Sequence, residues 1–312
     1  MPLEAAAARF LKRLNAVAPQ GFDQPSLDDL RGNLRALTAF AGTAPAVSRV
    51  DETLAAGAKR LPIRIYASQS GHWSDAPGLI YFHGGGLVAG DLDTHDALCA
   101  TLAKAASCVV IAVDYGLAPE NVFPGPFDDA LDAAEAILGA PGRYGLDPKR
   151  IAVGGDSAGG GLAVHVARSL RERAPGLIGL ALLCPALNVE PSSPSRMDLA
   201  RGHLLQEATL AAYWRLIRID GVATDDERLS PALRAEVAGL PPTLLHVAEF
   251  DPLRDEGEVF GRRLKSAGVK VSLRRHAGLI HHFYGLGGAI PAAREALAVF
   301  CADLAAMLRA GP

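Results

Sequence analysis

The feature that most constrains this chain is a glycine-rich segment, residues 154–161, with Ser157 near its centre. The apolar run 151–153 before it predicts a buried strand, and residues 162–170 after it predict a helix. The spacing G-x-S-x-G at a strand–helix junction is the pattern of a nucleophile elbow. Glycines flank the serine because so tight a turn brings the two backbones together, and a Cβ there would clash. Since a plain glycine-rich turn also fits this pattern, its meaning depends on the rest of the chain.

Short apolar strands alternate with helical stretches along most of the sequence. The strands are predicted at residues 79–82, 109–113, 151–153, 178–183, 243–248 and 269–273, and the helices at 94–107, 127–138, 254–267 and 291–309. Before them, an alternating stretch at 61–67 and a more irregular one around Val50 and Leu54 predict an antiparallel pair with a turn near Gly57. Continuously apolar strands separated by helices indicate a mostly parallel sheet with helices on both faces.

Two regions fall outside this alternation and predict a smaller helical part. Residues 1–45 contain two predicted helices, at residues 1–20 and 26–40. Residues 188–230 begin with a loop rich in proline and serine and continue into a helix. We expect these two regions to pack together as a helical cap. Residues 46–187 and 231–312 would then form the catalytic α/β domain.

One apolar helix face in the second region is a candidate lining for a substrate pocket. It carries Tyr213, Trp214 and Ile217. Such a face more often packs against the neighbouring domain, and the sequence leaves both roles open.

Composition narrows the choice of partner and compartment. The chain has 312 residues and a net charge of −3, which gives no reason to expect nucleic acid or an anionic membrane as a partner. The four cysteines Cys99, Cys108, Cys184 and Cys301 are far apart and show no C-x-x-C spacing, so we expect buried free thiols in a reducing compartment and no metal site. Charged residues interrupt the N-terminal apolar residues, which argues against a signal peptide. With no apolar run near the roughly 20 residues of a membrane span, we expect a cytoplasmic protein without stable membrane association.

A serine hydroxyl becomes a nucleophile only with a base, a carboxylate that orients the base, and donors for the oxyanion. In α/β hydrolases the order along the chain is serine, acid, histidine. Asp251 fits the acid, because it follows the predicted strand 243–248 and precedes Pro252, where the chain must turn. Asp255 is better placed in the first turn of the next helix, and Glu249 is still on the strand.

The base fits the adjacent pair His281 and His282, which follow the last predicted strand. The residues alone leave either of them possible. His276 lies near the end of that strand and is a weaker candidate. His165 and His246 fall inside a helix and a strand, where a hydrogen-bonded core histidine is the expected role.

The oxyanion donors fit the run His83-Gly84-Gly85-Gly86 at the end of the predicted strand 79–82. Three glycines allow the backbone to approach a substrate oxygen with bare N–H groups. The amide of Ala158, directly after the serine, supplies a further donor.

Taken together, these segments resemble the hormone-sensitive-lipase-like family of α/β-hydrolase esterases, also called bacterial family IV. The motifs are HGGG at 83–86, DYGLAPE at 114–120, GDSAGG at 155–160, DPLRDE at 251–256 and HHF at 281–283. The resemblance implies the α/β-hydrolase fold, a helical cap, hydrolysis of short- or medium-chain acyl esters, and homodimers. It also implies these roles: Ser157 as nucleophile, Asp251 as orienting acid, His281 as base, and Gly85, Gly86 and Ala158 as oxyanion donors.

The chain departs from the family pattern at two positions. His282 stands where the family has glycine, so it either crowds the site or adds a polar group to its rim. Gly116 stands where the family has arginine, and we expect the loss of a structural ion pair there.

The function predicted from these residues is that of a carboxylesterase that forms an acyl-enzyme and needs no metal or cofactor. Its partner would be a small acyl ester. An amide, lactone or formamide hydrolase could use the same groups. A small-molecule receptor on a disused hydrolase scaffold is a third reading, but such a protein would be expected to lose a member of the triad.

Overall fold

The computed structural model describes residues 2–17, 25–68, 74–173, 176–190, 192–217 and 226–310. Within these ranges an eight-stranded sheet runs in the order β1-β2-β4-β3-β5-β6-β7-β8. Its strands are β1 (Ser48–Ala56), β2 (Lys59–Ala67), β3 (Ala76–Phe82), β4 (Val109–Val113), β5 (Leu146–Asp156), β6 (Gly179–Leu183), β7 (Thr243–Phe250) and β8 (Val271–Ile280).

The pairing of the strands confirms the expected mostly parallel sheet. The strands from β4 to β8 in the sheet order pair parallel. Only β2 runs against this direction in its pairing with β4, and β1 pairs antiparallel with β2 through the predicted turn at Gly57. The order changes direction at β3, whose neighbours are β4 and β5, and ligands of open α/β sheets bind at the carboxyl ends of strands beside such a point.

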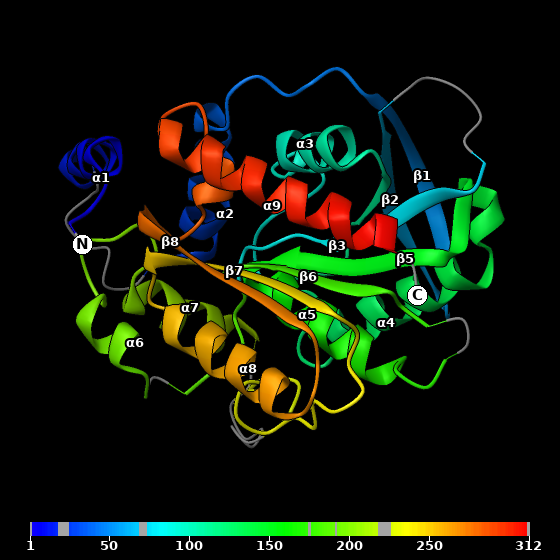
Figure 1. Ribbon diagram of the computed structural model, residues 1–312. Helices are drawn as coiled ribbons and strands as arrows, with labels where there is room; N and C mark the ends of the chain where they lie inside the picture. The colour runs from blue at the N-terminus through cyan, green and yellow to red at the C-terminus, as the bar shows by residue number, and fades with distance from the viewer. Residues whose placement is uncertain are drawn as a thin grey trace.

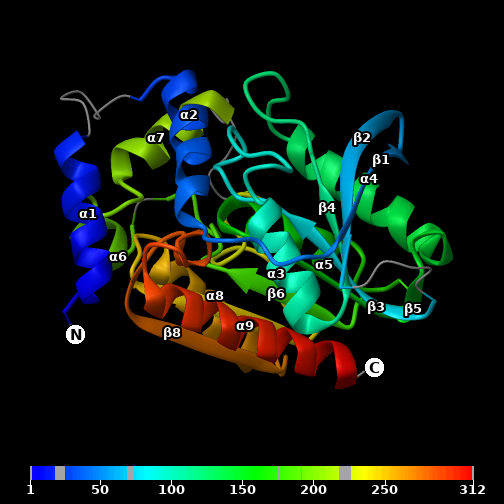
Figure 2. The ribbon, with the colours of Figure 1, turned by 90° about the horizontal axis from the view of Figure 1, so that it is seen from above.

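Helices cover both faces of the sheet, as Figure 1 shows. One face carries α3 (Asp96–Ala106) and α9 (Pro291–Ala310), and the other carries α4 (Gly125–Gly139), α5 (Ser157–Ser169) and α8 (Arg254–Ser266). The remaining elements are α1 (Ala5–Val17), α2 (Leu27–Leu37), α6 (Pro194–Asp198), α7 (Glu207–Ile217) and the short 3₁₀ helices η1 (Thr38–Phe40), η2 (Pro141–Tyr144) and η3 (Phe283–Gly285). Figure 2 shows α1, α2, α6 and α7 gathered at one side of the molecule.

Two apolar layers follow from the alternation of side chains along the strands. On β3, Ile80 and Phe82 belong to one buried cluster, whereas Leu79 and Tyr81 belong to the other. Leu162 of α5 packs in the first cluster, and the α9 side chains pack in the second. Burial on both faces explains why the central strands read as continuous apolar runs.

The N-terminal region begins with helices at the expected places. The helix predicted from residue 26 is α2. It starts with a capping box in which the Asp29 N–H donates to the Ser26 hydroxyl and the Ser26 N–H donates to the Asp29 carboxylate. The first helix ends at Val17, and the last residues expected for it, 18–20, lie outside the described residues.

The last strand is longer than predicted. The sequence indicated residues 269–273, but β8 continues to Ile280, which pairs with Phe250 of β7 beyond a shift in the register of the two strands. Arg274 and Arg275 interrupt the apolar pattern since β8 lies at the edge of the sheet, where side chains reach solvent. His276 therefore lies inside the strand.

The edge of the sheet at β8 is partly covered by the segment before α1. The backbone N–H of Glu4 donates to the carbonyl of Gly278, 2.9 Å away. Gly278 has a φ of +71°, and a Cβ on it would lie 2.8 Å from the Glu4 nitrogen, so glycine permits this contact. The Glu4 carboxylate in turn accepts the N–H of Ala7 in the first turn of α1 at 2.8 Å.

A buried glutamate joins α8 to the start of the second expected cap region, residues 188–230. Glu256 is 3% exposed, and its Oε1 accepts the backbone N–H groups of Leu187 at 2.6 Å and Asn188 at 3.2 Å. Within the described part of the chain, its Oε2 has no hydrogen-bond partner. Burial raises the pKa of the Glu256 carboxyl to about 8.

We predict that Glu256→Gln makes the stability of the protein less sensitive to alkaline pH. A carboxyl whose pKa is raised from 4.5 to about 8 in the fold stabilises the protein while protonated, and this stabilisation is lost as the pH rises through that window. The glutamine keeps the accepting oxygen and has no charge to bury. Urea unfolding at pH 6 and pH 9 should show a smaller loss of unfolding free energy in the variant than in the wild type.

The control is Glu135→Gln on the exposed side of α4. It should follow the wild type at both pH values. An equal loss of stability in the wild type and in Glu256→Gln would contradict the prediction.

Candidate active site

The turn from β5 into α5 has the geometry of an elbow. Ser157 is the first residue of α5 and has a φ of +49°, in the left-handed region. A Cβ on Gly155 would lie 2.4 Å from the carbonyl carbon of Gly159, and a Cβ on Gly159 would lie 2.1 Å from the carbonyl oxygen of Phe82. Both glycines are therefore required by close backbone contacts, as the sequence suggested.

The loop after β3 lies next to this turn because β3 and β5 are neighbouring strands, with Phe82 paired to Gly155. Gly85 and Gly86 have φ values of +116° and +65°. Neither donates its backbone N–H to a group in the described residues, and both line the same cavity as Ser157. The amide of Ala158 is in the first turn of α5, where helix N–H groups have no partner within the helix. The arrangement can hold a negatively charged oxygen.

The Asp156 carboxylate ties these two segments together. Asp156 is 1% exposed and accepts hydrogen bonds from the Tyr81 hydroxyl at 2.7 Å and the Gly84 backbone N–H at 3.1 Å. Nε2 of His95 lies 3.3 Å from its other oxygen. Burial alone would raise the pKa of Asp156, but the nearby His95 and the hydrogen bonds from His95 and Tyr81 hold it well below its usual range.

Sequence reasoning missed this role of Asp156 and His95. The available signal was a charged residue at the end of a buried strand, which is rare without a partner. The partners themselves have no recognisable spacing from Asp156.

Asp251 and His281 come together because β7 and β8 are neighbours and Phe250 pairs with Ile280. Nδ1 of His281 lies 2.8 Å from Oδ2 of Asp251, which is fully buried and accepts the Leu253 N–H through Oδ1 at 2.8 Å. This contact leaves Nε2 of His281 for the cavity that Ser157 also lines. No direct hydrogen bond between Ser157 and His281 is present, a contact that often tightens only with substrate bound.

The two competing acids are used elsewhere. Asp255 lies in the first turn of α8 and accepts the backbone N–H of Ser195 at 2.8 Å. Glu249, on β7, accepts the Gly278 N–H at 2.7 Å. Of the three carboxylates considered, Asp251 is the one placed against a histidine of the cavity.

His95 and His282 line the cavity together with Ser157, whereas His246 and His165 are not among its lining residues. His246 is fully buried, with Nε2 3.3 Å from Asp303 and Nδ1 3.0 Å from His276 Nε2, which is the hydrogen-bonded core role expected for it. His165, on α5, packs edge-on against the Phe127 ring. His282 lines the cavity beside the base.

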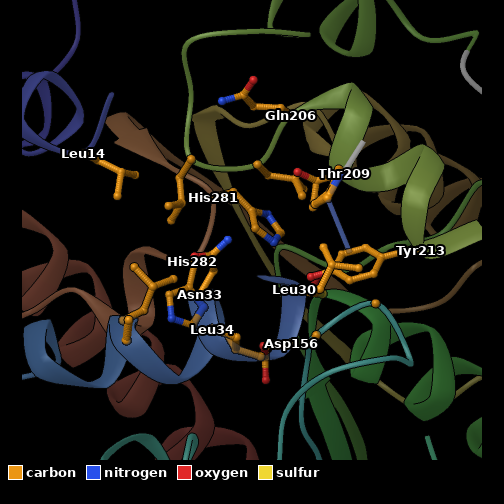
Figure 3. A pocket seen from close by; sticks show the side chains of 18 of the residues that line it. Leu14, Leu30, Asn33, Leu34, Asp156, Gln206, Thr209, Tyr213, His281 and His282 are labelled. Atoms are coloured by element: carbon orange, nitrogen blue, oxygen red, sulfur yellow. The ribbon is translucent and has the colours of Figure 1, made fainter. Parts of the chain in front are cut away.

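A cavity of about 190 Å³ opens over these groups. Ser157, His281, Gly85 and Gly86 line it from the sheet side, and α1, α2 and α7 line it from the other side. Figure 3 shows Leu14, Leu30, Asn33, Leu34, Gln206, Thr209 and Tyr213 among the lining side chains. Both regions expected to form a cap therefore contribute to the wall of this cavity.

Of the three aromatic and apolar residues suggested for the pocket, Tyr213 alone lines this cavity. It packs on the oxyanion loop, where a Cβ on Gly86 would lie 2.3 Å from its ring, and burial raises its pKa to about 12. The structure places Ile217 in the apolar core with no exposed surface and packs Trp214 against the same core. Tyr213 and Ile217 lie one turn apart on the same side of α7, which borders the cavity at Tyr213 and enters the core at Ile217.

The position of Gly116 is away from the cavity. Its backbone N–H donates to Asp129 at 3.0 Å, and that carboxylate also binds Lys59 at 2.5 Å and the Asn121 amide at 2.9 Å. A Cβ on Gly116 would lie 2.6 Å from the Asn121 amide nitrogen. Lys59 therefore supplies the positive charge that pairs with the buried Asp129, and no cation is needed at position 116 for this pair.

The four cysteines are buried free thiols, as expected. In the described ranges, Cys184, Asp251 and His281 form a group whose ligand atoms lie within 4.8 Å of one another. A metal ion in this group would have to displace the hydrogen bond between Asp251 and His281, because both would be ligands.

None of the described helices is long and apolar enough to cross a bilayer.

Comparison with known proteins agrees with this geometry. A family model of the α/β hydrolase fold matches residues 79–285. The carboxylic ester hydrolase LipN of Mycobacterium tuberculosis is 36% identical over 300 residues, which cover 91% of this chain and 79% of that protein. The ethyl acetate hydrolase of Pseudomonas putida is 38% identical over 241 residues, 76% of each chain. The structure of an ester hydrolase from the metagenome of Lake Arreo, complexed with a derivative of bipyridine phosphonate, matches with a TM-score of 0.92 and 33% identity over 97% of this chain and 98% of that chain.

These matches define the class as the α/β-hydrolase fold esterases. The chain belongs to the hormone-sensitive-lipase-like family within that class, and it is a carboxylic ester hydrolase. The resemblance found in the sequence motifs and the α/β-hydrolase fold expected from it are both confirmed.

We predict that Gly159→Ala removes activity and destabilises the protein by about 3 kcal/mol or more, because the new Cβ would meet backbone oxygens that cannot move independently. Gly139→Ala at the end of α4, where nothing lies within 4 Å of the new Cβ, is the control and should remain fully active. Thermal unfolding and ester turnover of both variants would check this. Normal activity of Gly159→Ala would contradict the prediction, because it would show that the elbow and the end of β3 can move apart without loss of function.

Proposed function

We propose that this enzyme hydrolyses short- to medium-chain carboxylic esters through an acyl-enzyme formed on Ser157. The observation that carries the proposal is the 2.8 Å contact between the buried Asp251 and His281, at a cavity lined by Ser157. The free N–H groups of Gly85 and Gly86 on the same cavity support it. No metal ion or cofactor takes part in the proposed steps.

In the first half of the proposed reaction, Ser157 Oγ attacks the ester carbonyl carbon while Nε2 of His281 takes the hydroxyl proton. The carbonyl π electrons move onto oxygen, and the N–H groups of Gly85, Gly86 and Ala158 hold that oxyanion. Asp251 keeps the Nδ1 proton of His281 in place and stabilises the imidazolium.

Collapse of the tetrahedral intermediate breaks the bond to the alcohol oxygen, which leaves with the proton from His281. A water molecule then repeats the attack on the acyl-enzyme, with His281 again as base. As the second intermediate collapses, His281 gives the proton taken from the water to Ser157 Oγ, so the carboxylic acid leaves and the free serine is restored.

The size of the cavity supports small substrates. Its volume of about 190 Å³ is below the roughly 300–1,000 Å³ of sites that hold drug-sized ligands. Apolar side chains such as Leu30 and Leu34 line it, which suits a short acyl or alkyl chain. The similarity to an ethyl acetate hydrolase supports the same size class.

The proposal includes a helical cap made of residues 1–45 and 188–230. Its support is that α1, α2 and α7 all line the cavity and that the Asn15 side chain donates to the Gly202 carbonyl at 3.3 Å. We also propose that the enzyme works in the cytoplasm, supported by four buried free thiols.

We predict that p-nitrophenyl esters from acetate upward are turned over, with the rate falling for chains longer than the cavity accepts. Ser157→Ala and His281→Ala should lower kcat by about 1,000-fold or more, because nucleophile and base act as one unit. His282→Ala should keep turnover, since His281 holds the contact with Asp251. Steady-state rates on the four proteins provide the measurement.

Two results would change the proposal. If His282→Ala is inactive and His281→Ala is active, the base is His282. If the wild type hydrolyses amides or lactones but no ester, the substrate class is wrong while the triad remains.

We predict that Asp251→Asn lowers kcat by about 1,000-fold or more with the fold intact, because asparagine cannot hold the His281 tautomer that accepts the serine proton. Circular dichroism and kcat would be measured together. Asp255→Asn, in the first turn of α8, is the matched control and should keep kcat within about threefold. A folded Asp251→Asn with near-normal turnover would remove Asp251 from the triad.

A further inference from the structure

His282 has a backbone conformation that few side-chain-bearing residues adopt. Its φ and ψ are +63° and +17°, in the left-handed region where glycine is favoured. It lies between the base His281 and the short helix η3, and its carbonyl accepts the Gly285 N–H at 2.9 Å. Strained conformations of this kind cluster at sites where a side chain has a functional position to keep.

The position of the imidazole ring is set by three neighbours. It packs edge-on against Tyr284, with ring centroids 4.9 Å apart, and lies 6.4 Å from the His95 ring. A Cβ on Gly285 would lie 2.3 Å from Nε2 of His282, so the glycine leaves room for the ring. The ring is thus packed in one place instead of extending into solvent.

The ring brings unpaired hydrogen-bonding groups to the cavity. It lines the same space as Ser157 and His281, together with Asn33 and Leu34 of α2, as Figure 3 shows. Neither ring nitrogen hydrogen-bonds to a group in the described residues. A polar group held in a binding cavity without a partner disfavours occupants that cannot hydrogen-bond to it.

The ring is also uncharged under ordinary conditions. Burial and then the neighbouring His95 lower the pKa of His282 to about 3. A neutral imidazole offers one N–H donor and one nitrogen acceptor at the same time. It can therefore donate a hydrogen bond to a neutral substrate oxygen without bringing a positive charge into the cavity.

We propose that His282 is a specificity-determining residue whose ring N–H donates to an ether, hydroxyl or carbonyl oxygen in the acyl or alcohol chain of the substrate. The enzyme would then prefer short esters that carry such an oxygen over hydrocarbon esters of the same shape. This inference rests on the proposed ester hydrolysis and adds the chemical class of ester that fits the site.

The test uses two pairs of esters of matched shape. On the acyl side, p-nitrophenyl methoxyacetate is compared with p-nitrophenyl butanoate, and on the alcohol side, 2-methoxyethyl acetate with butyl acetate. The quantity measured is the ratio of kcat/KM within each pair, divided by the ratio of the hydroxide-catalysed rates. A general loss of activity cancels in this ratio.

The variants are His282→Gly, which removes the ring and suits the left-handed backbone, and His282→Asn, which keeps a donor and tolerates that backbone. Relative to the wild type, His282→Gly should lower the ratio for at least one pair by about 3- to 10-fold, the worth of one neutral hydrogen bond. His282→Asn should recover part of it.

Ser107→Gly is the control for removing strain alone, because Ser107 is exposed, has a φ of +53°, and lies after α3 outside the cavity lining. It should leave both ratios as in the wild type. Unchanged ratios for both pairs in His282→Gly would overturn the role of His282 while ester hydrolysis stands. A wild type inactive on all four esters and on p-nitrophenyl acetate would instead overturn the proposed function, and this inference with it.

Discussion

The buried carboxylate of Asp156 is the interaction on which the two halves of the site depend. It ends β5 directly before Ser157, and it accepts hydrogen bonds from Tyr81 inside β3 and from Gly84 in the loop after β3. One carboxylate therefore connects the segment that carries the nucleophile to the loop whose N–H groups would bind the oxyanion. Because the carboxylate is buried, loss of either donor would remove part of the hydrogen bonding that compensates its charge, so the two segments keep a common geometry.

The register of the strands positions the rest of the site, including the acid Asp251 and the base His281. Phe82 pairs with Gly155 and Phe250 pairs with Ile280. These pairings align the carboxyl ends of β3 with β5 and of β7 with β8. The loops that leave those ends carry the glycine run, Ser157, Asp251 and His281. Backbone hydrogen bonds between strands thus set the distances between catalytic groups that lie far apart in the chain.

Much of this could be read from the sequence, because apolar runs and glycine motifs reflect local sterics and burial. The strand–helix alternation and the antiparallel pair around Gly57 were predictable in this way, whereas the α/β-hydrolase fold was implied by the resemblance of the motifs to a known family. The contact of Asp156 with His95 was not, since it joins residues without a characteristic spacing. The sequence of the helix that carries Tyr213 and Ile217 indicated only an apolar side. It did not indicate which residues line the cavity and which lie in the core.

The segment around α1 has two structural roles, one in the cavity wall and one at the edge of the sheet. Leu14 forms part of the cavity wall, and Glu4, at the start of the same helix, covers the edge strand β8 through Gly278. An uncovered edge strand is a template for pairing with another chain. If substrate entry requires α1 to move as a unit, each opening would briefly bare that edge, so easier access to the catalytic serine would come with a greater tendency to aggregate.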